Sequence, residues 1–174
     1  MLIFLLGFMG SGKTHCGKEI AQHFHMPFID LDQEIERRTG KTISSIFAEE
    51  GETNFRKIES ETLWSMIQHV ENFENSAGAV ISCGGGTPCF HKNMDTMNQH
   101  GLTVWLNPST QVLLARLKHE QTKRPLIAGL SEEALETFIL NKTQEREVYY
   151  RQAAIIAQGA DCPIDLIENK IKHV

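Results

Sequence analysis

The amino-acid sequence predicts an α/β protein with three layers, α/β/α, built on a five-stranded parallel sheet. Five short apolar runs alternate along the chain with segments in which apolar residues recur at helical spacing. The 174 residues are 41% hydrophobic and contain no long proline, serine or glycine tract, so we expect one domain over residues 1–174. Sheets of this kind bind ligands at the carboxyl ends of their strands, and functional residues are expected there.

The first half of the chain is expected to alternate strands with helices. Leu2–Leu6 is an apolar run that ends at Gly7. The helix that follows has its apolar spacing at Cys16, Ile20 and Phe24. Residues 27–30 form the next strand, and Thr42 is the expected N-cap of a short helix that ends near Gly51. A longer helix follows with one apolar stripe of Phe55, Ile58, Thr62, Met66 and Val70.

The second half continues the same alternation. Strands are expected at residues 79–81, 102–106 and 153–157. Helices are expected to begin at Ser109 or Thr110, at about Ser131 and at Pro163, the second of them ending near Tyr150. The polar stretch at residues 119–123 between two of these helices is expected to be mobile.

Charge and hydropathy exclude two classes of partner. The chain carries 17 Lys plus Arg against 22 Asp plus Glu, a formal net charge of -5, which argues against nucleic-acid binding through a generally basic surface. The longest apolar run, Leu2–Leu6, is far shorter than a membrane span and lacks the flanks of a secretory signal. We therefore expect a cytoplasmic monomer with neither a nucleic-acid nor a membrane partner.

The cysteines and histidines predict neither a disulfide framework nor a metal site. The four cysteines show no CxxC pair and no zinc-finger spacing, so reduced thiols are expected at Cys16, Cys83, Cys89 and Cys162. Helical metal-ligand spacing with a matching carboxylate is not found for His23, His25, His91, His100 and His119. A metalloenzyme is therefore not expected.

A phosphate-binding loop is the strongest functional signal. Residues 7–14 read GFMGSGKT, match the pattern GxxxxGK[ST] and lie between an expected strand and an expected helix. The glycines let backbone N–H groups turn toward phosphate oxygens, and the helix N-terminus adds positive potential. Lys13 is expected to reach the outer phosphates, and the Thr14 hydroxyl to ligate magnesium. The alternative, a glycine-rich turn with a surface lysine, requires both the spacing and the position to be accidental.

Two carboxylates stand where the second strand ends. Asp30 and Asp32 are two positions apart, so in an extended backbone their side chains point to the same side of the sheet. Asp30 could then hold magnesium through water, while Asp32 accepts a hydrogen bond, and the proton, from a substrate hydroxyl. On spacing alone it is equally plausible that these acids cap the helical segment at residues 33–38.

Several motifs occur together in the order typical of one family. After the phosphate loop and the acid pair, the chain has GExxFRxxE at residues 51–59, GGG at 84–86, RPL at 124–126 and then Arg146. Over roughly residues 1–157 the chain resembles the shikimate kinases, P-loop α/β enzymes related to nucleoside monophosphate kinases. The resemblance implies transfer of the γ-phosphoryl group of ATP to the 3-hydroxyl of shikimate, with Mg²⁺, in aromatic amino acid biosynthesis.

The resemblance also implies roles for individual residues. Catalytic roles fall to Lys13, Asp32 and Arg124. The nucleotide is expected to contact Gly10, Ser11, Gly12, Lys13, Thr14, Cys16, Arg116 and Arg124. Shikimate is expected to contact Asp32, Arg56, Gly84, Gly85, Gly86 and Arg146, and its binding helices to lie within about residues 32–70. Magnesium is expected on Thr14 and Asp30. Residues 118–130 would form a mobile lid that carries Arg124 over the site.

These assignments agree with the chemistry of an anionic, hydroxylated acceptor. A guanidinium can bind a carboxylate through two hydrogen bonds, and Glu59, one turn from Arg56, could hold that arginine in place. Singly, each arginine is more often a surface charge, and Arg116 could equally be solvated or lie against adenine. The Arg56 and Glu59 pair could be an ordinary helix pair, and the glycine triplet a plain turn.

Other functions also fit the phosphate loop. Another small-molecule kinase, for gluconate or a nucleoside monophosphate, has the same need for it, as does a nucleotide-dependent binding module. The chain also departs from the usual family pattern at residues 147–150, where a proline is common, and at residues 87–100.

Overall fold

The structure is a computed structural model that describes residues 1–72, 78–159 and 161–173. The strands are β1 (Leu2–Leu6), β2 (Phe28–Asp30), β3 (Ala79–Ser82), β4 (Leu102–Asn107) and β5 (Ile155–Gln158). The α-helices are α1 (Lys13–His23), α2 (Leu31–Thr39), α3 (Ile43–Glu71), α4 (Asn93–His100), α5 (Thr110–Lys118), α6 (Glu132–Tyr150) and α7 (Ile164–Lys172). Short 3-10 helices are η1 (Thr87–Cys89), η2 (Gln121–Lys123) and η3 (Pro125–Ile127).

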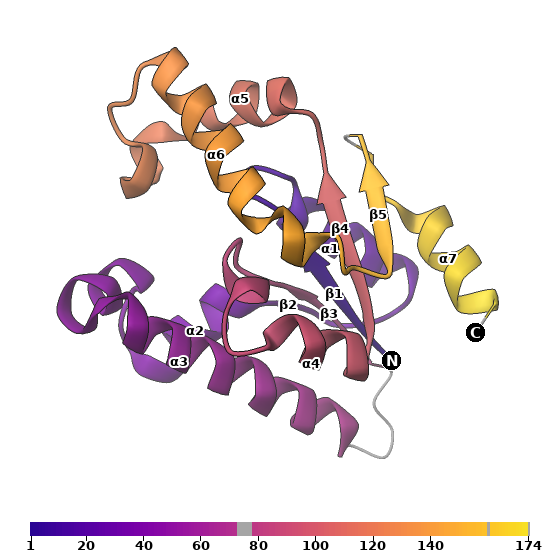
Figure 1. Ribbon diagram of the computed structural model, residues 1–174. Helices are drawn as coiled ribbons and strands as arrows, with labels where there is room; N and C mark the ends of the chain where they lie inside the picture. Colours follow the sequence, from indigo (N-terminus) through magenta and orange to yellow (C-terminus); the bar gives the residue numbers. More distant parts are fainter. Residues whose placement is uncertain (73–77, 160, 174) are drawn as a thin grey trace.

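The strands form one sheet in the order β2-β3-β1-β4-β5, and every neighbouring pair is parallel. Helices cover both faces of this sheet (Figure 1), so the predicted α/β/α layers are confirmed. Each predicted strand is present to within two residues at its ends. The helix α4 was not predicted, because its polar sequence shows only two buried apolar residues at helical spacing, Met94 and Met97.

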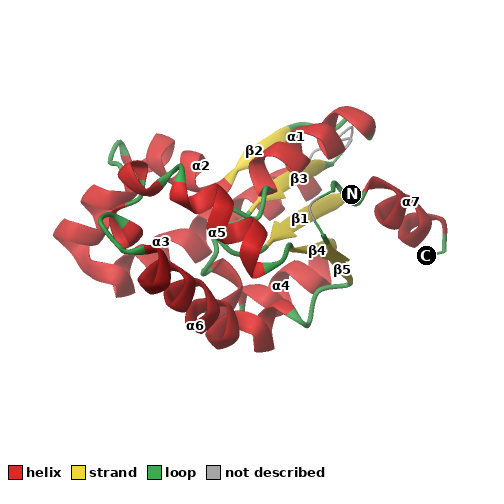
Figure 2. Cartoon of the chain, turned by 90° about the horizontal axis from the view of Figure 1, so that it is seen from above, coloured by secondary structure: helices red, strands yellow, loops and turns green. Residues whose placement is uncertain are grey.

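The central strand β1 explains how both faces are buried. Its alternate residues Leu2, Phe4 and Leu6 belong to a core cluster that includes side chains of α3 and α4. Ile3 and Leu5 belong to a second cluster, which includes side chains of α1 and α7 on the opposite face (Figure 2). A strand buried on both faces reads as a continuous apolar run, and this is why β1 was recognisable in the sequence.

Side-chain caps begin three of the predicted helices at the expected positions. The hydroxyl oxygens of Thr42, Ser109 and Ser131 each accept a hydrogen bond from the backbone N–H three residues later. The two helices predicted around Gly51 follow one another directly within α3, which breaks at Gly51 with φ 78° and ψ 169°. This left-handed φ suits glycine, and it separates the first turns of α3 from the long helix behind them.

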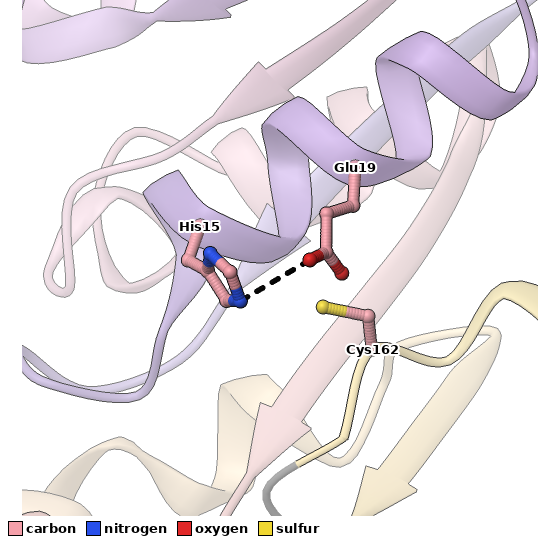
Figure 3. A group of neighbouring side chains, drawn as sticks. All are labelled: His15, Glu19 and Cys162. Carbon is pink, nitrogen blue, oxygen red and sulfur yellow. Dashed lines mark ion pairs between the residues drawn. The ribbon is translucent and has the colours of Figure 1, made fainter.

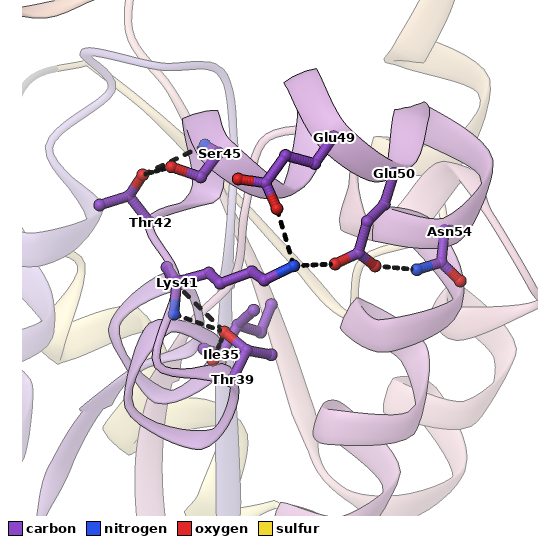
Figure 4. A network of polar contacts seen from close by, with 8 residues as sticks. All are labelled: Ile35, Thr39, Lys41, Thr42, Ser45, Glu49, Glu50 and Asn54. Carbon is purple, nitrogen blue, oxygen red and sulfur yellow. Dashed lines mark hydrogen bonds and ion pairs between the residues drawn. The ribbon is translucent and has the colours of Figure 1, made fainter.

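An exposed polar network spans the break in α3. Lys41 Nζ lies 2.8 Å from a carboxylate oxygen of Glu49 and 2.7 Å from one of Glu50 (Figure 4). Glu50 also accepts a hydrogen bond from Asn54, which lies on the other side of Gly51. Each exposed pair contributes little by itself. Together they connect the loop before α3 to both sides of its kink.

One expectation about the cysteines is wrong. Cys16 and Cys162 form a disulfide, with their Cα atoms 5.1 Å apart, whereas Cys83 and Cys89 are free thiols. The bond joins α1 to the segment before α7, and the two cysteines are 146 positions apart in the sequence. Only the folded chain brings them together, so their spacing gave no signal. In the part of the chain that the structure describes, no helix has the length and apolar character needed to cross a membrane.

Candidate active site

A cleft of about 530 Å³ opens where β1, β2 and β3 end. Its lining consists of Met9, Gly10, Gly12, Lys13, Thr14, His15, Asp30, Asp32, Ser82, Cys83, Gly84, Gly85, Arg116, Glu120 and Arg124. The predicted site residues outside this lining are Ser11, Cys16, Arg56, Gly86 and Arg146. The volume is within the range of small-molecule sites, about 300–1,000 Å³.

The phosphate loop leaves polar groups without protein partners. Gly10 and Gly12 have φ angles of 78° and 98°, and no side chain caps the N-terminus of α1. The first backbone N–H groups of a helix need acceptors from outside the helix. Among the described residues, the buried hydroxyl of Ser11 also has no hydrogen-bond partner. An anion with several oxygens, such as a phosphate chain, fits these unused donors.

Lys13 is folded back over the loop that it follows. Its Nζ donates hydrogen bonds of 2.8 Å to the Gly7 carbonyl and 3.0 Å to the Phe8 carbonyl. Burial lowers the pKa of Lys13 to about 8, although the Asp32 carboxylate acts in the opposite direction. The ammonium group therefore remains mostly protonated at neutral pH. Its position at the start of α1 places this cation beside the uncapped helix N-terminus.

The two acids at the end of β2 differ in conformation from the expectation. Asp30 caps α2, because its Oδ1 accepts hydrogen bonds from the backbone N–H groups of Asp32 (3.1 Å) and Gln33 (3.3 Å). Asp32 lies in the first turn of α2, so the extended backbone assumed for the pair is wrong. Both acids nevertheless line the cleft. The capping interpretation therefore holds for Asp30 and leaves the Asp32 side chain for another role.

The electrostatic surroundings of Asp32 favour its neutral form. Burial is the main cause, and the nearby carboxylates of Asp30 and Glu59 add to it, so that the pKa rises from 3.8 to about 6. A carboxylate with such a pKa is still ionised at neutral pH and is a stronger base than an ordinary aspartate.

Arg56 is a buried residue and not a solvated surface charge. Its side chain is 10% exposed, and Nη1 donates a 2.9 Å hydrogen bond to the fully buried carboxylate of Glu59. The other oxygen of Glu59 accepts a 2.5 Å hydrogen bond from the Thr87 hydroxyl. The guanidinium carbon also lies 4.4 Å from the centre of the Phe90 ring. Glu59 holds Arg56 in place, as the sequence suggested, together with Glu52, whose Oε1 accepts hydrogen bonds from Nε (3.2 Å) and Nη2 (3.0 Å) of Arg56.

The glycine triplet lies against two guanidinium groups. A Cβ atom on Gly86 would lie 2.6 Å from Nη2 of Arg56, and one on Gly85 would lie 2.9 Å from Nη1 of Arg146. At either distance a side chain on the glycine would require the guanidinium group to move. The structure therefore brings Arg56 and Arg146, which are 90 positions apart in sequence, to the same short loop.

The opposite end of the triplet adjoins acidic groups. A Cβ atom on Gly84 would lie 2.9 Å from Oε1 of Glu59 and 3.4 Å from Oδ1 of Asp32. The buried Tyr150 hydroxyl donates a 2.5 Å hydrogen bond to the Gly85 carbonyl. Tyr150 therefore connects the end of α6 to the loop that both arginines contact.

The remaining predicted arginines lie on the nucleotide side of the cleft. Arg116 Nη1 donates a 3.1 Å hydrogen bond to the Gly10 carbonyl, so it covers the phosphate loop. Arg124 pairs with Glu120 through bonds of 2.9 Å from Nε and 2.5 Å from Nη2. The segment predicted as a mobile lid contains η2 and η3, and its Ile127 is fully buried. Its mobility stays a prediction.

Cys16 belongs to the core and takes part in a disulfide. Its sulfur is bonded to Cys162, and its backbone N–H donates to the Gly12 carbonyl at 2.9 Å. The residue is 3% exposed within the core cluster under α1. These bonds tie Cys16 to the protein itself, and its contact with the nucleotide stays a prediction.

Comparisons with known proteins agree with this geometry. A family model described as shikimate kinase matches residues 9–173. A shikimate kinase of Azobacteroides pseudotrichonymphae is 46% identical over 173 residues, which is 99% of this chain and 98% of that protein. The chain belongs to the shikimate kinase family. A crystal structure of shikimate kinase from Bacteroides thetaiotaomicron has a TM-score of 0.85 at 38% identity and covers 99% of this chain and 97% of that one.

A second solved shikimate kinase, from Acinetobacter baumannii, was determined in complex with shikimate. It has a TM-score of 0.81 at 30% identity, covering 99% of this chain and 91% of that one. Within this shikimate kinase fold, sequence reasoning did not single out several residues that line the cleft or support it: Met9, His15, Ser82, Cys83, Thr87, Glu120 and Tyr150. For Ser82 and Cys83 a signal existed, because Ser82 ends a strand and Cys83 follows it immediately before the glycine triplet.

Proposed function

We propose that this chain transfers the γ-phosphoryl group of ATP to the 3-hydroxyl of shikimate, giving shikimate 3-phosphate and ADP in aromatic amino acid biosynthesis. The observation that carries the proposal is the glycine triplet, with Arg56 and Arg146 at one end and Asp32 at the other. Two guanidinium groups suit a carboxylate, and an aspartate suits a hydroxyl that must lose a proton. Membership of the family and the shikimate complex of a relative support the same acceptor.

The nucleotide side of the cleft is assigned to the phosphates of ATP. Backbone N–H groups around Gly10 and Gly12, the Ser11 hydroxyl and the Lys13 ammonium are the donors available there. Arg116 is assigned to the border of the nucleotide, and its hydrogen bond to the Gly10 carbonyl of the phosphate loop supports this. The uncapped N-terminus of α1 adds a favourable potential for the negative charge.

Thr14 and Asp30 are the residues that would hold Mg²⁺. Both line the cleft, and the two capping bonds of Asp30 use its Oδ1 atom, which leaves the second oxygen for a cation or for its water. Hydroxyl and carboxylate oxygens are suitable ligands for this hard cation. When bound, Mg²⁺ offsets the negative charge of the phosphates. Turnover should therefore stop when EDTA removes divalent cations.

Asp32 and Arg124 are assigned to the transfer step itself. Asp32 is the group that accepts the hydroxyl proton, because its raised pKa of about 6 combines ionisation at neutral pH with higher basicity. Arg124 would leave Glu120 when its segment closes, and its charge would then stabilise the transferring phosphoryl group. Closure also excludes water, which would otherwise hydrolyse ATP.

An acceptor assay tests the proposed function. The purified chain is mixed with ATP, Mg²⁺ and either shikimate, gluconate or AMP, and ADP and the phosphorylated product are measured. Shikimate alone should be phosphorylated efficiently. Phosphorylation of gluconate or AMP without shikimate would identify a different kinase, and nucleotide binding without any transfer would indicate a binding module.

Variants of two arginines sharpen the same test. Arg56→Lys keeps the positive charge but loses the planar fork, so KM for shikimate should rise at least about tenfold while KM for ATP stays unchanged. Arg37→Lys is the matched control, since Arg37 also pairs with a glutamate but its side chain is 71% exposed on α2. An equal loss of ATP affinity in Arg56→Lys would place Arg56 on the nucleotide side.

We further propose that the enzyme works as a cytoplasmic monomer. All the groups invoked for binding and transfer come from one chain, so the site needs no residue from a second copy. Light scattering of the active enzyme should give a mass near 19.7 kDa, the mass of one chain. A mass twice as large under assay conditions would contradict this.

A further inference from the structure

The disulfide between Cys16 and Cys162 has no role in the proposed phosphoryl transfer. It connects the first turn of α1 to the segment just before α7. Cys16 is 3% exposed, whereas Cys162 is half-buried. The sulfur pair therefore lies between the core under α1 and the surface, and solvent can reach it from the Cys162 side.

Two more metal-ligating side chains lie beside this sulfur pair. His15 and Glu19 are one turn apart on α1, and His15 Nε2 lies 3.3 Å from Glu19 Oε1 (Figure 3). The ligand atoms of His15, Glu19 and Cys162 all lie within 4.8 Å of one another. The His15 side chain is 77% exposed and that of Glu19 47% exposed, so a cation can reach them directly from solvent.

We propose that Cys16, Cys162, His15 and Glu19 form a Zn²⁺ site when the disulfide is reduced. A dithiol reductant supplies two electrons and two protons to the S–S bond, which leaves two thiols, and the reductant becomes a disulfide. Zn²⁺ then forms two Zn–S bonds while both thiol protons go to solvent. Two thiolates, one imidazole and one carboxylate are donors that four-coordinate zinc accepts.

The donor set favours zinc over the magnesium assigned to the cleft. Thiolate and imidazole ligands suit zinc, whereas magnesium prefers oxygen ligands and keeps several of its waters. Zinc bonds of about 2.0–2.3 Å place tetrahedral donors about 3.5 Å apart, so the ligand atoms of His15, Glu19 and Cys162, now up to 4.8 Å apart, must approach by about 1 Å. The fourth donor, the Cys16 sulfur, is bonded to the Cys162 sulfur and must separate from it once the disulfide is reduced. Three donors lie on one helix, and Cys162 lies on the loop before α7, which can make this adjustment.

The sulfur atoms of Cys16 and Cys162 cannot form the disulfide and bind zinc at the same time. The sulfurs of a disulfide carry no thiolate charge and are weak ligands, so the oxidised chain should not hold zinc at this site. Bound zinc in turn occupies both thiolates and should slow formation of the disulfide. The site is therefore a redox-controlled zinc site adjoining the phosphate loop, with Thr14 next to His15.

Cobalt(II) is the probe that separates this site from the carboxylates of the cleft. Thiolate ligation gives Co²⁺ an intense charge-transfer band in the near ultraviolet, whereas ligation by Asp30 or a hydroxyl does not. The whole chain, reduced and without nucleotide, should bind Co²⁺ with this band, and added Zn²⁺ should remove it by displacement. The oxidised chain, with its disulfide verified by mass spectrometry, should give no band.

Single variants assign the ligands. Cys162→Ser should abolish the band, and His15→Ala or Glu19→Gln should weaken Zn²⁺ binding at least about tenfold, because even outer partners of metal ligands contribute about 10–100-fold to affinity. Cys89→Ser and His23→Ala are matched controls, because Cys89 is a free thiol elsewhere in the chain and His23 is a histidine further along α1. Both variants should bind Zn²⁺ and Co²⁺ as the unchanged chain does.

Four results would overturn the proposal. They are no band in the reduced chain, a band that persists in Cys162→Ser, a band that is lost in Cys89→Ser, and equal Zn²⁺ affinity in the reduced and oxidised chains. Every readout is metal binding and not turnover, so the outcome is independent of the proposed kinase activity.

Discussion

Replacing Asp32 by asparagine should stabilise the protein while removing its activity. The pKa of this carboxyl is raised from 3.8 to about 6, mainly by burial. Each pKa unit corresponds to about 1.4 kcal/mol, so keeping Asp32 ionised in the folded state costs up to about 3 kcal/mol. Because water still reaches this half-buried side chain, we expect Asp32→Asn to gain about 1–3 kcal/mol at pH 7.

The pH dependence of this gain has a definite sign. Between about pH 4 and pH 6 the folded wild type keeps a proton on Asp32 that the unfolded chain has lost, so wild-type stability from this group falls as the pH rises. Asparagine does not titrate, so the variant's stability lacks this pH-dependent contribution. Its advantage should therefore be near zero below about pH 4, grow up to about pH 6 and stay constant above.

Urea unfolding at several pH values measures the difference in free energy of unfolding between the wild type and Asp32→Asn. Initial rates measure the loss of kcat in the variant, which should be at least about 100-fold. Glu61→Gln is the matched control, because that carboxylate is 67% exposed on α3, and its stability should change by less than about 0.5 kcal/mol. A stability difference that is absent at pH 7, or equally large at all pH values, would refute the electrostatic reasoning. A stabilised variant with normal kcat would remove Asp32 from the transfer step.

Three other variants test the supports around the cleft. Lys13→Ala should lose most turnover, and near-normal turnover would contradict the assigned role. Its midpoint of thermal unfolding should move by only a few degrees, because the substitution removes the cost of burying a charge together with the two hydrogen bonds of the ammonium group. Arg124→Ala should bind ATP almost normally but lose about 10³-fold in kcat, and hydrogen exchange at residues 118–130 should slow only with both ligands bound. Tyr150→Phe removes the bond to the Gly85 carbonyl, so stability should fall by about 1 kcal/mol and KM for shikimate should rise, while an unchanged KM would mean that the loop keeps its position without Tyr150.

Features encoded over a few neighbouring residues were predicted well from the sequence. The phosphate loop, the capping residues Thr42, Ser109 and Ser131, and the break at Gly51 each depend on local backbone geometry, and each appears at its expected position. Strands buried on both faces gave equally clear apolar runs. These signals establish the fold, because the order of strands and helices in such a protein leaves few topologies.

Features that depend on contacts between distant segments were not predictable. Cys16 and Cys162 carry no local pattern, and nothing in the sequence places the Tyr150 hydroxyl beside the Gly85 carbonyl. The error at Asp32 has a local cause. Asp30 as an N-cap starts α2 immediately after β2, so the extended backbone ends at Asp30, two residues before Asp32.

The glycine triplet was predicted as part of the site, but the reason for its three glycines was not. The sequence suggested that these glycines let the backbone approach a ligand. None of Gly84, Gly85 and Gly86 has a positive φ angle, so a left-handed backbone is not what requires glycine here. Their lack of a side chain matters for space, since guanidinium nitrogens of Arg56 and Arg146 lie only 2.6 Å and 2.9 Å from where Cβ atoms of Gly86 and Gly85 would be. A plain turn would not need this, because any small residue could form it. The triplet is therefore part of how the two guanidinium groups are positioned, and alanine at Gly85 or Gly86 should impair acceptor binding through the arginine that it displaces.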